Sequence, residues 1–150
     1  MKVGIGCDQA GVKFKEQIKD YVKSLGFEVE DYGTYTTDPV DYPDIAREVC
    51  QGVADGVCQR GILICGTGIG MCIAANKMRG IRAALCSDPY SARMARLHND
   101  ANVMTLGARV LGFGVACDIV KAYLTAEYEG GRHDARIEKM MRLERKDEIK

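Results

Sequence analysis

The sequence predicts an α/β fold: a doubly wound, Rossmann-like parallel sheet of five strands with helices on both faces. Short apolar runs alternate with longer amphipathic stretches along the chain, which is the pattern of successive βαβ units. Crossovers of that kind join parallel strands and lay helices over the sheet. The 150 residues suffice for one compact core, and no linker, repeat or low-complexity segment divides them. We therefore expect one domain over residues 1–150.

Strands are predicted where short apolar runs stand between polar or glycine-rich turns. They are Val3–Cys7, Phe27–Tyr32, Gly61–Cys65, Arg82–Cys86 and Asn102–Leu106. Helices are predicted where longer amphipathic stretches separate these runs. They are Gly11–Leu25, Asp44–Ala54, Gly68–Met78, Asp88–Leu97 and Gly112–Leu124. Gly26 can cap the first helix, and Pro89 suits the first turn of the fourth, where a missing N–H costs nothing.

A charged last helix is predicted from His133 to Lys150, after the hinge-like segment Glu129-Gly130-Gly131. It carries apolar residues such as Ile137 and Met140 beside several arginines. A terminal helix of this kind can pack on its own domain or on a partner subunit. We favour the subunit contact.

The composition excludes several classes of function. The formal net charge is zero, so no basic excess marks a nucleic-acid surface. Apolar runs are shorter than the ~20 residues of a membrane span. The N-terminus has no h-region or cleavage site of a signal peptide. We expect a cytoplasmic protein without nucleic-acid or membrane partners.

The cysteines and histidines predict neither disulfides nor a metal site. The seven cysteines are odd in number and include no CxxC pair, so a disulfide framework is not expected and a reducing compartment is. The spacing of zinc ligands is absent and the chain has two histidines, so we expect no structural zinc site.

The strongest local motif is Cys65-Gly66-Thr67-Gly68-Ile69-Gly70, between a predicted strand and a predicted helix. Ligand sites of doubly wound folds lie beyond the carboxyl ends of strands. Glycines let the backbone approach a ligand, and a helix N-terminus presents N–H groups to an anion. The motif can thus cradle a phosphate, or form an oxyanion hole for an enediolate with Thr67 as a donor. The plain alternative is a tight turn that needs glycine for steric reasons alone.

Cys65 stands where a helix dipole favours a thiolate, which could act as a nucleophile or a base. The alternative is a small buried hydrophobic side chain, as is common for free cysteine. The glycine spacing departs from G-x-G-x-x-G, which disfavours a dinucleotide site.

Four further residues are candidates for acid–base chemistry or phosphate binding. His98 precedes the fifth strand, and histidine is the natural acid or base near neutral pH, although a lone histidine after a helix is often a cap or surface residue. Arg109, Arg132 and Arg136 can each bind a phosphate, because the guanidinium fork matches phosphate oxygens. Arg132 and Arg136 are four apart and would share one face of a helix.

Short segments spread over the chain occur together in one order. They are Gly6-Cys7-Asp8, Asp41-Tyr42-Pro43, Ile64–Gly70, Ala74-Ala75-Asn76-Lys77, Gly80-Ile81-Arg82-Ala83, His98–Asn102, Gly107-Ala108-Arg109 and Glu129–His133. In this combination the chain closely resembles the family that joins ribose-5-phosphate isomerase of the B type with galactose-6-phosphate isomerase. The resemblance covers roughly residues 3 to 145.

The resemblance implies an isomerase without cofactor or metal, assembled as a homodimer or a dimer of dimers. Its substrates would be ribose 5-phosphate and ribulose 5-phosphate. Cys65 would move a proton between C1 and C2, and His98 would assist opening of the sugar ring. The enediolate would be held by Gly66, Thr67, Gly68, Ile69 and Gly70. The sugar hydroxyls would be bound by Asp8 and Asn99, and the phosphate by Arg109, Arg132 and Arg136.

One position departs from the family pattern. Gln9 stands where the family usually has histidine after the aspartate of the first strand. Glutamine can bind substrate through hydrogen bonds but cannot carry charge or move a proton. A hexose phosphate (allose or galactose 6-phosphate) is therefore an alternative substrate. An alternative of another class is a nucleotide- or sugar-phosphate-binding module without catalysis.

Overall fold

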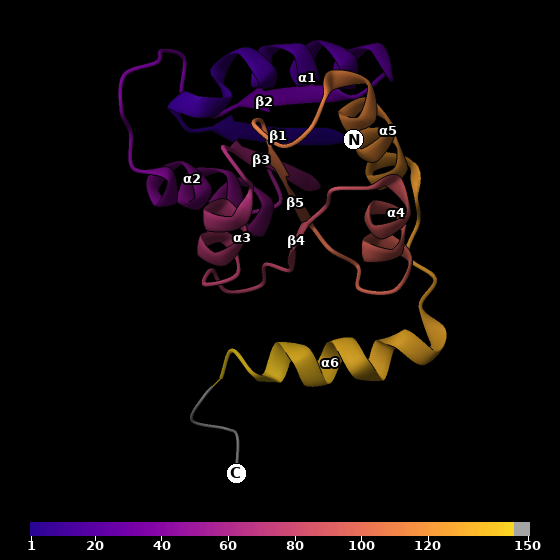
Figure 1. Ribbon diagram of the computed structural model, residues 1–150. Helices are drawn as coiled ribbons and strands as arrows, with labels where there is room; N and C mark the ends of the chain where they lie inside the picture. The colour runs from indigo at the N-terminus through magenta and orange to yellow at the C-terminus, as the bar shows by residue number, and fades with distance from the viewer. Residues whose placement is uncertain (146–150) are drawn as a thin grey trace.

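The structure is a computed structural model that describes residues 1–145, and its centre is a five-stranded parallel sheet (Figure 1). The strands are β1 (Lys2–Cys7), β2 (Glu28–Asp31), β3 (Arg60–Cys65), β4 (Ala83–Leu85) and β5 (Val103–Gly107). They lie in the order β2-β1-β3-β5-β4, and every neighbouring pair is parallel. The winding reverses between β1 and β3. The predicted doubly wound sheet is confirmed, and ligand sites of such sheets lie at the carboxyl ends of the strands where the winding reverses.

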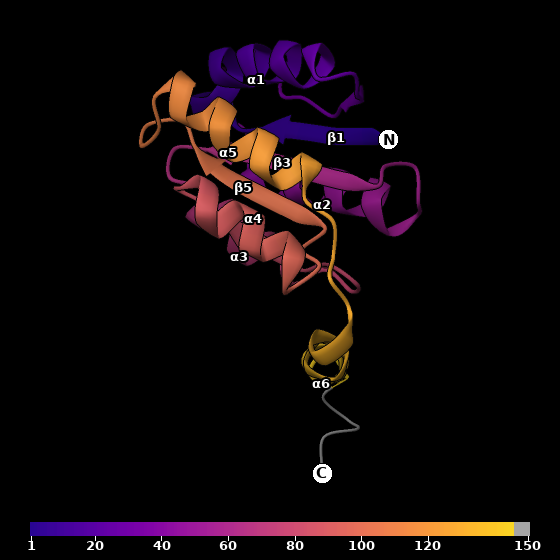
Figure 2. The ribbon, with the colours of Figure 1, turned by 90° about the vertical axis from the view of Figure 1, so that its right-hand side faces the viewer.

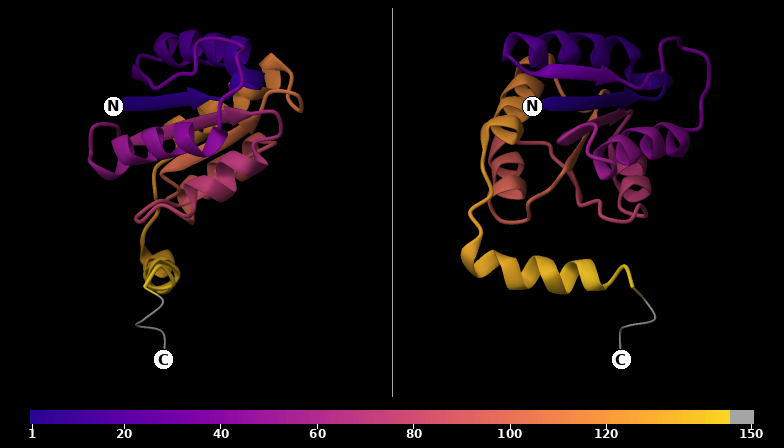
Figure 3. Two further views of the ribbon diagram at one scale, coloured as in Figure 1. Left: turned by 90° about the vertical axis from the view of Figure 1, so that its left-hand side faces the viewer. Right: turned by 180° about the vertical axis from the view of Figure 1, so that it is seen from behind.

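Helices cover both faces of the sheet (Figures 1 and 3). They are α1 (Val12–Ser24), α2 (Tyr42–Ala54), α3 (Ile69–Ala75), α4 (Pro89–Leu97), α5 (Phe113–Thr125) and α6 (Asp134–Arg142), with short 3-10 turns η1 (Gln9–Gly11) and η2 (Gly131–His133). Helices α1, α4 and α5 share a hydrophobic core with one face, and α2 and α3 with the other. Among residues 1–145, no helix is both long and apolar enough to span a membrane.

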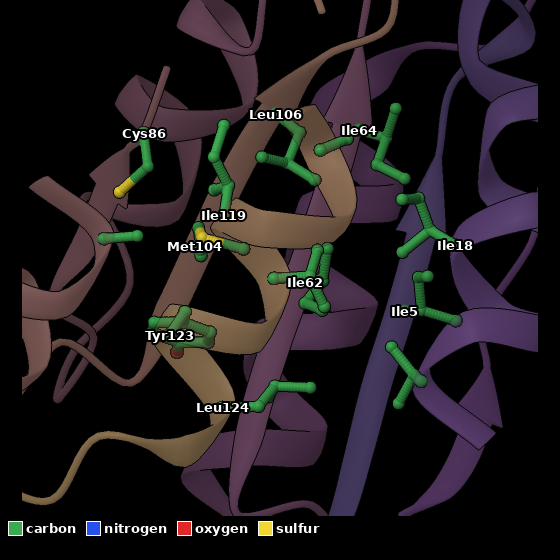
Figure 4. Packing of buried hydrophobic residues seen from close by; sticks show 14 of the residues in the cluster. Ile5, Ile18, Ile62, Ile64, Cys86, Met104, Leu106, Ile119, Tyr123 and Leu124 are labelled. Atoms are coloured by element: carbon green, nitrogen blue, oxygen red, sulfur yellow. The ribbon is translucent and has the colours of Figure 1, made fainter. Parts of the chain in front are cut away.

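The central strand β3 pairs with β1 and β5, and helices cover both of its faces, so all of its residues are buried. Ile62 and Ile64 point into the core formed with α1 and α5, where Ile18 and Ile119 meet them (Figure 4). The alternate residues, Leu63 and Cys65, belong to the core under α2 and α3. Fully burying an aliphatic side chain contributes about 1.5–3 kcal/mol. The strand that carries Cys65 is therefore fixed firmly from both sides.

The predicted boundaries hold for most elements and are wrong at two helix ends. The helix predicted to reach Met78 ends at Ala75, because the Asn76 side chain leaves the helix to bind the edge strand. Its Oδ1 accepts from the Ala83 N–H (2.8 Å) and its Nδ2 donates to the Ala83 carbonyl (2.9 Å). The last helix begins at Asp134 and ends at Arg142. Residues 143–145 are not helical, which corrects the prediction there, and residues 146–150 of its predicted span lie outside the described residues.

Helix α6 stands beyond the β4 edge of the sheet rather than in either helical layer (Figures 1 and 2). Its side chains are all exposed or half-buried. The Gly80 N–H donates to Glu144 just after the helix (2.9 Å), and the Arg82 guanidinium contacts the Met141 sulfur (3.5 Å). A groove of about 700 Å³ separates the helix from the edge strand. That α6 makes a subunit contact stays a prediction.

Candidate active site

The glycine-rich motif forms a compact nest at the carboxyl end of β3. Gly68 has φ +81°, in the left-handed region, and α3 begins immediately after it. The Gly68 N–H donates to Cys65 Sγ (3.1 Å), and the Ile69 N–H donates to Thr67 Oγ1 (3.2 Å). The buried Thr105 hydroxyl donates to the Gly68 carbonyl (2.8 Å) and anchors the nest to β5. The chain thus folds N–H donors and a thiol into one turn.

Close packing makes glycine obligatory at two points of this nest. A Cβ on Gly68 would lie 2.6 Å from Leu85 Cδ1 and 2.9 Å from the Leu106 carbonyl carbon. A Cβ on Gly107 would lie 2.7 Å from the Thr67 carbonyl oxygen. Packing alone therefore requires glycine at these two positions. It does not exclude ligand binding, because the same packing holds the turn in place.

Cys65 differs from the other strand-end cysteines in its surroundings. It is 5% exposed, and its sulfur already accepts a backbone N–H. Burial raises the pKa of the Cys86 thiol to about 12 and that of Cys7 to about 11, so both stay protonated near neutral pH. Cys7 Sγ lies 3.6 Å from the Thr34 carbonyl, with which it shares a weak hydrogen bond. Among these three thiols, Cys65 is the one placed beside the nest.

Asp8 and Gln9 follow the carboxyl end of β1, which lies beside the carboxyl end of β3 because the two strands are neighbours. The Asp8 N–H donates to the Ile64 carbonyl (3.1 Å), and the Asp8 carboxylate accepts from the Ala10 N–H (3.0 Å). Gln9 Oε1 accepts from the Val40 N–H (3.2 Å). Gln9 therefore ties the long loop before α2 to the carboxyl end of β1.

Arg109 brings positive charge to the same carboxyl end of the strands. Its N–H donates to the Gly66 carbonyl (3.0 Å), and its Nη1 would lie 3.5 Å from a Cβ built on Gly66. Tyr42, which has no predicted role, also belongs to this region. Its ring carbon Cζ would lie 2.8 Å from a Cβ on Gly70, and the side chain remains 41% exposed. The segment Asp41-Tyr42-Pro43 was a sequence signal for the family but gave no role for the ring.

His98 belongs to a second cluster, formed with His133 and Glu129. The two imidazole rings stack with centroids 4.4 Å apart and an interplanar angle of 20°. Glu129 Oε2 lies 3.3 Å from His133 Nε2 and 3.9 Å from His98 Nε2. The Glu129 N–H donates to the Leu97 carbonyl (3.1 Å) and fixes the segment beside His98. His133 and Glu129 were not predicted site residues, because only the fold brings them to His98.

The two clusters lie at opposite ends of the strands, which we call the carboxyl edge and the amino edge of the sheet. Helix α4 joins the parallel strands β4 and β5, so it carries the chain back from the carboxyl edge to the amino edge. His98 caps its C-terminus and therefore lies at the amino edge, whereas Cys65 ends β3 at the carboxyl edge. A strand of the length of β5 spans on the order of 16 Å. One chain therefore does not bring Cys65 and His98 to the same substrate.

The predicted phosphate ligands are also distributed between the carboxyl edge and the amino edge. Arg109 lies at the nest, whereas Arg132 lies in η2 next to His133 and Arg136 in the first turn of α6. Arg132 lies in η2, before α6 begins at Asp134, so the two arginines do not stand in one helix as the sequence predicted. Asn99 follows His98 with an exposed side chain, and its carbonyl accepts from Arg82 Nε (3.1 Å).

Together the fold and the nest define a doubly wound α/β protein with a thiol, N–H donors and a guanidinium where its winding reverses, a place suited to a small anionic ligand. A sequence model of the family described as Ribose/Galactose Isomerase matches residues 3–140. The chain belongs to that family.

Individual relatives match this chain over nearly its full length. The chain is 48% identical to "Ribose-5-phosphate isomerase B" of Escherichia coli (strain K12), with 97% of each chain covered. It is 49% identical to "D-erythrulose-4-phosphate isomerase" of Pectobacterium atrosepticum, with 93% of each covered. The solved ribose-5-phosphate isomerase B of Clostridium thermocellum is 52% identical with a TM-score of 0.95, covering 98% of this chain and 99% of that one.

Proposed function

We propose that this chain is an aldose–ketose isomerase that interconverts ribose 5-phosphate and ribulose 5-phosphate through an enediolate. The observation that carries the proposal is the position of Cys65, whose sulfur meets the N–H of Gly68 inside the nest, in a member of the Ribose/Galactose Isomerase family. We further propose that residues 1–150 act as one catalytic domain in the cytoplasm.

The proposed reaction needs a base beside an anion-stabilising group. Cys65, as thiolate, takes the proton from C2 of the open aldose and returns it to C1. The hydroxyl proton passes from O2 to O1, which leaves the C2 ketone and the C1 hydroxyl of the ketose. The negative charge that develops on oxygen is stabilised by the N–H groups of Gly66 to Gly70 and by the Thr67 hydroxyl. Donors held in place before the reaction stabilise such charge without reorganisation. None of these proposed steps uses a metal or a cofactor.

The remaining residues bind the substrate and prepare it. His98 passes protons between the ring oxygen and the C1 hydroxyl as the furanose opens. Asp8, Gln9 and Asn99 bind sugar hydroxyls. The phosphate is held by Arg109, Arg132 and Arg136. Binding energy from this remote group helps to orient C1 and C2.

We also propose that the active site is shared between two subunits of a homodimer, alone or within a dimer of dimers. The separation of Cys65 and His98 across the sheet supports this arrangement. A two-fold axis would bring the amino-edge cluster of one subunit, with Arg132 and Arg136, to the partner's Cys65, and would repeat the exchange in the second site.

The substrate can be tested by comparing initial rates. The assay uses ribose 5-phosphate, allose 6-phosphate, galactose 6-phosphate and D-erythrulose 4-phosphate. The four-carbon sugar is included because the chain is as similar to a D-erythrulose-4-phosphate isomerase as to a ribose-5-phosphate isomerase B. We expect the highest kcat/KM for ribose 5-phosphate. A higher value for another sugar would reassign the substrate.

A non-catalytic module would behave differently. It would gain thermal stability from a bound sugar phosphate or from NAD, as any ligand of the folded state does, without turnover. Stabilisation by ribose 5-phosphate together with turnover supports the isomerase. Stabilisation by NAD without turnover of any of the four sugars would contradict it.

A further inference from the structure

We propose that His98, Glu129 and His133 form a binding site for a divalent transition-metal ion such as Zn²⁺, and that an ion bound there inhibits the isomerase. Each residue offers one ligand atom, and the three atoms lie within 4.8 Å of one another. The inhibition rests on the proposed role of His98, whereas the binding does not.

The distances in this cluster suit a small ion. Zinc binds imidazole nitrogen and carboxylate oxygen at about 2.0–2.2 Å, which in a tetrahedral site separates ligand atoms by roughly 3.3–3.5 Å. His133 Nε2 and Glu129 Oε2 are already 3.3 Å apart, and His98 Nε2 is 3.9 Å from the same oxygen. The three ligand atoms lie within 4.8 Å of one another. Closing the set to these distances takes a movement of the exposed Glu129 side chain and a rotation of the His98 ring, because stacked imidazoles cannot both direct their in-plane lone pairs at one ion. Three protein ligands leave one position for water.

The backbone holds the three ligands together before any ion binds. Leu97 accepts the Glu129 N–H (3.1 Å), and Gly130 accepts the His133 N–H (3.2 Å). Gly130 and Gly131 have φ values of +67° and +60°, a left-handed turn that returns His133 to Glu129. The His133 side chain is 5% exposed and packs face to face on His98. His133 is thus fixed, whereas His98, whose side chain is 37% exposed, must turn out of the stack so that both ring nitrogens face one ion.

The chemistry of the set favours a transition metal. Two imidazoles and a carboxylate match the preferences of Zn²⁺, Co²⁺ and Ni²⁺. Hard cations such as Mg²⁺ prefer oxygen ligands and fit this set poorly. The exposed Arg132 beside His133 opposes positive charge, so we expect micromolar rather than tighter binding.

An ion here would block the proposed acid–base chemistry. Coordination occupies the lone pair of His98 Nε2, and the imidazole can then neither accept nor donate the proton at that atom. The expected behaviour is a basal rate that a chelator leaves unchanged, a lower rate with added Zn²⁺, and recovery when the chelator is added. Catalysis without a metal and inhibition by one are therefore compatible.

The experiment titrates the full-length protein with Co²⁺, following visible absorption and heat of binding. Glu129→Gln removes an exposed ligand with little risk to folding, and His133→Asn removes a buried one. We expect each to weaken binding about 10-fold or more, since even residues that only support a ligand matter that much. Glu127→Gln, an exposed acid two positions away, is the matched control. Cys65→Ala tests the competing thiol.

Binding that persists in Glu127→Gln and Cys65→Ala but weakens in Glu129→Gln supports the site. Absence of binding at micromolar Co²⁺ overturns it, as does binding that depends on Cys65 and shows a sulfur-to-cobalt charge-transfer band. Binding without inhibition by Zn²⁺ overturns the inhibitory consequence. A protein that binds Co²⁺ as expected but isomerises no sugar supports the site and refutes the proposed function.

Discussion

The two edges of the sheet are built in opposite ways. At the carboxyl edge, the nest from Cys65 to Gly70 is contiguous in sequence and is shaped by backbone and glycine packing. At the amino edge, His98, Glu129 and His133 come from distant parts of the chain and meet through side chains. The first edge offers a thiol and N–H donors, and the second offers imidazoles and arginines. Neither holds a complete set for the proposed reaction, which is why we expect two subunits to combine them.

The largest effect should come from removing the base at the carboxyl edge. Cys65→Ala should lower kcat by ~10²–10⁴-fold, the typical contribution of a general base, with little change in binding of ribose 5-phosphate. Cys86→Ala is the control, because Cys86 belongs to the core on the other face of the sheet from Cys65 and its thiol stays protonated. Steady-state rates and calorimetric binding measure both variants. Similar activity in the two would show that the carboxyl edge does not supply the base.

Mixing the two kinds of defect should restore activity. Cys65→Ala should remove a needed side chain from the carboxyl edge, and Arg136→Ala should remove one from the amino edge, so each variant alone should be inactive. After joint unfolding and refolding, about half of the dimers should be mixed, and one site in each should contain both native residues. About a quarter of all sites should then recover activity. If mass spectrometry verifies mixed dimers and the rate stays at background, each site lies within one chain.

The role of the amino edge can be separated by substrate shape. His98→Asn should lower kcat/KM for ribose 5-phosphate, which is mostly a furanose, by up to ~10²-fold. D-erythrulose 4-phosphate and its aldose cannot close a furanose, because O4 carries the phosphate. Their isomerisation should be slowed much less. The ratio of the two kcat/KM losses is the measurement, and equal losses would rule out a role in ring opening.

A smaller effect should follow from disturbing the packing under the nest. Gly107→Ala places a Cβ 2.7 Å from the Thr67 carbonyl oxygen and should cost about 1–3 kcal/mol of unfolding free energy. Gly114→Ala meets no atom within 4 Å and lies in helix α5, so it should stabilise the protein by about 0.4–1 kcal/mol. Urea unfolding of the two variants measures both effects. Equal unfolding midpoints would show that the turn accommodates a Cβ at residue 107 without loss of stability.

The smallest expected effect is none at all. Dialysis against a strong chelator should leave the rate unchanged, because the proposed steps at both edges use side chains and backbone only. The assay is run before and after dialysis with the same enzyme concentration. A loss that added divalent ion restores would contradict metal-independent isomerisation.

The same contrast explains what could be predicted from the sequence. The strand β3 and the nest were predictable because their signals are local: an apolar run followed by closely spaced glycines. The partnership of His98 with His133 was not, because it depends on the path of the chain after α5 and on the turn at Gly130. The end of α3 also escaped prediction, since Asn76 leaves the helix for a partner in β4. Long-range side-chain contacts carry no periodicity that a single sequence reveals.

Gln9 has a consequence for the acid tolerance of the molecule. Its Oε1 accepts the N–H of Val40 and so fastens the loop that leads to Tyr42. A histidine in that place could accept the same hydrogen bond only through an unprotonated ring nitrogen, which is lost as the pH falls below about 6.5. An amide oxygen keeps its lone pairs throughout that range. In this chain, the fastening of the loop is therefore insensitive to mild acidification.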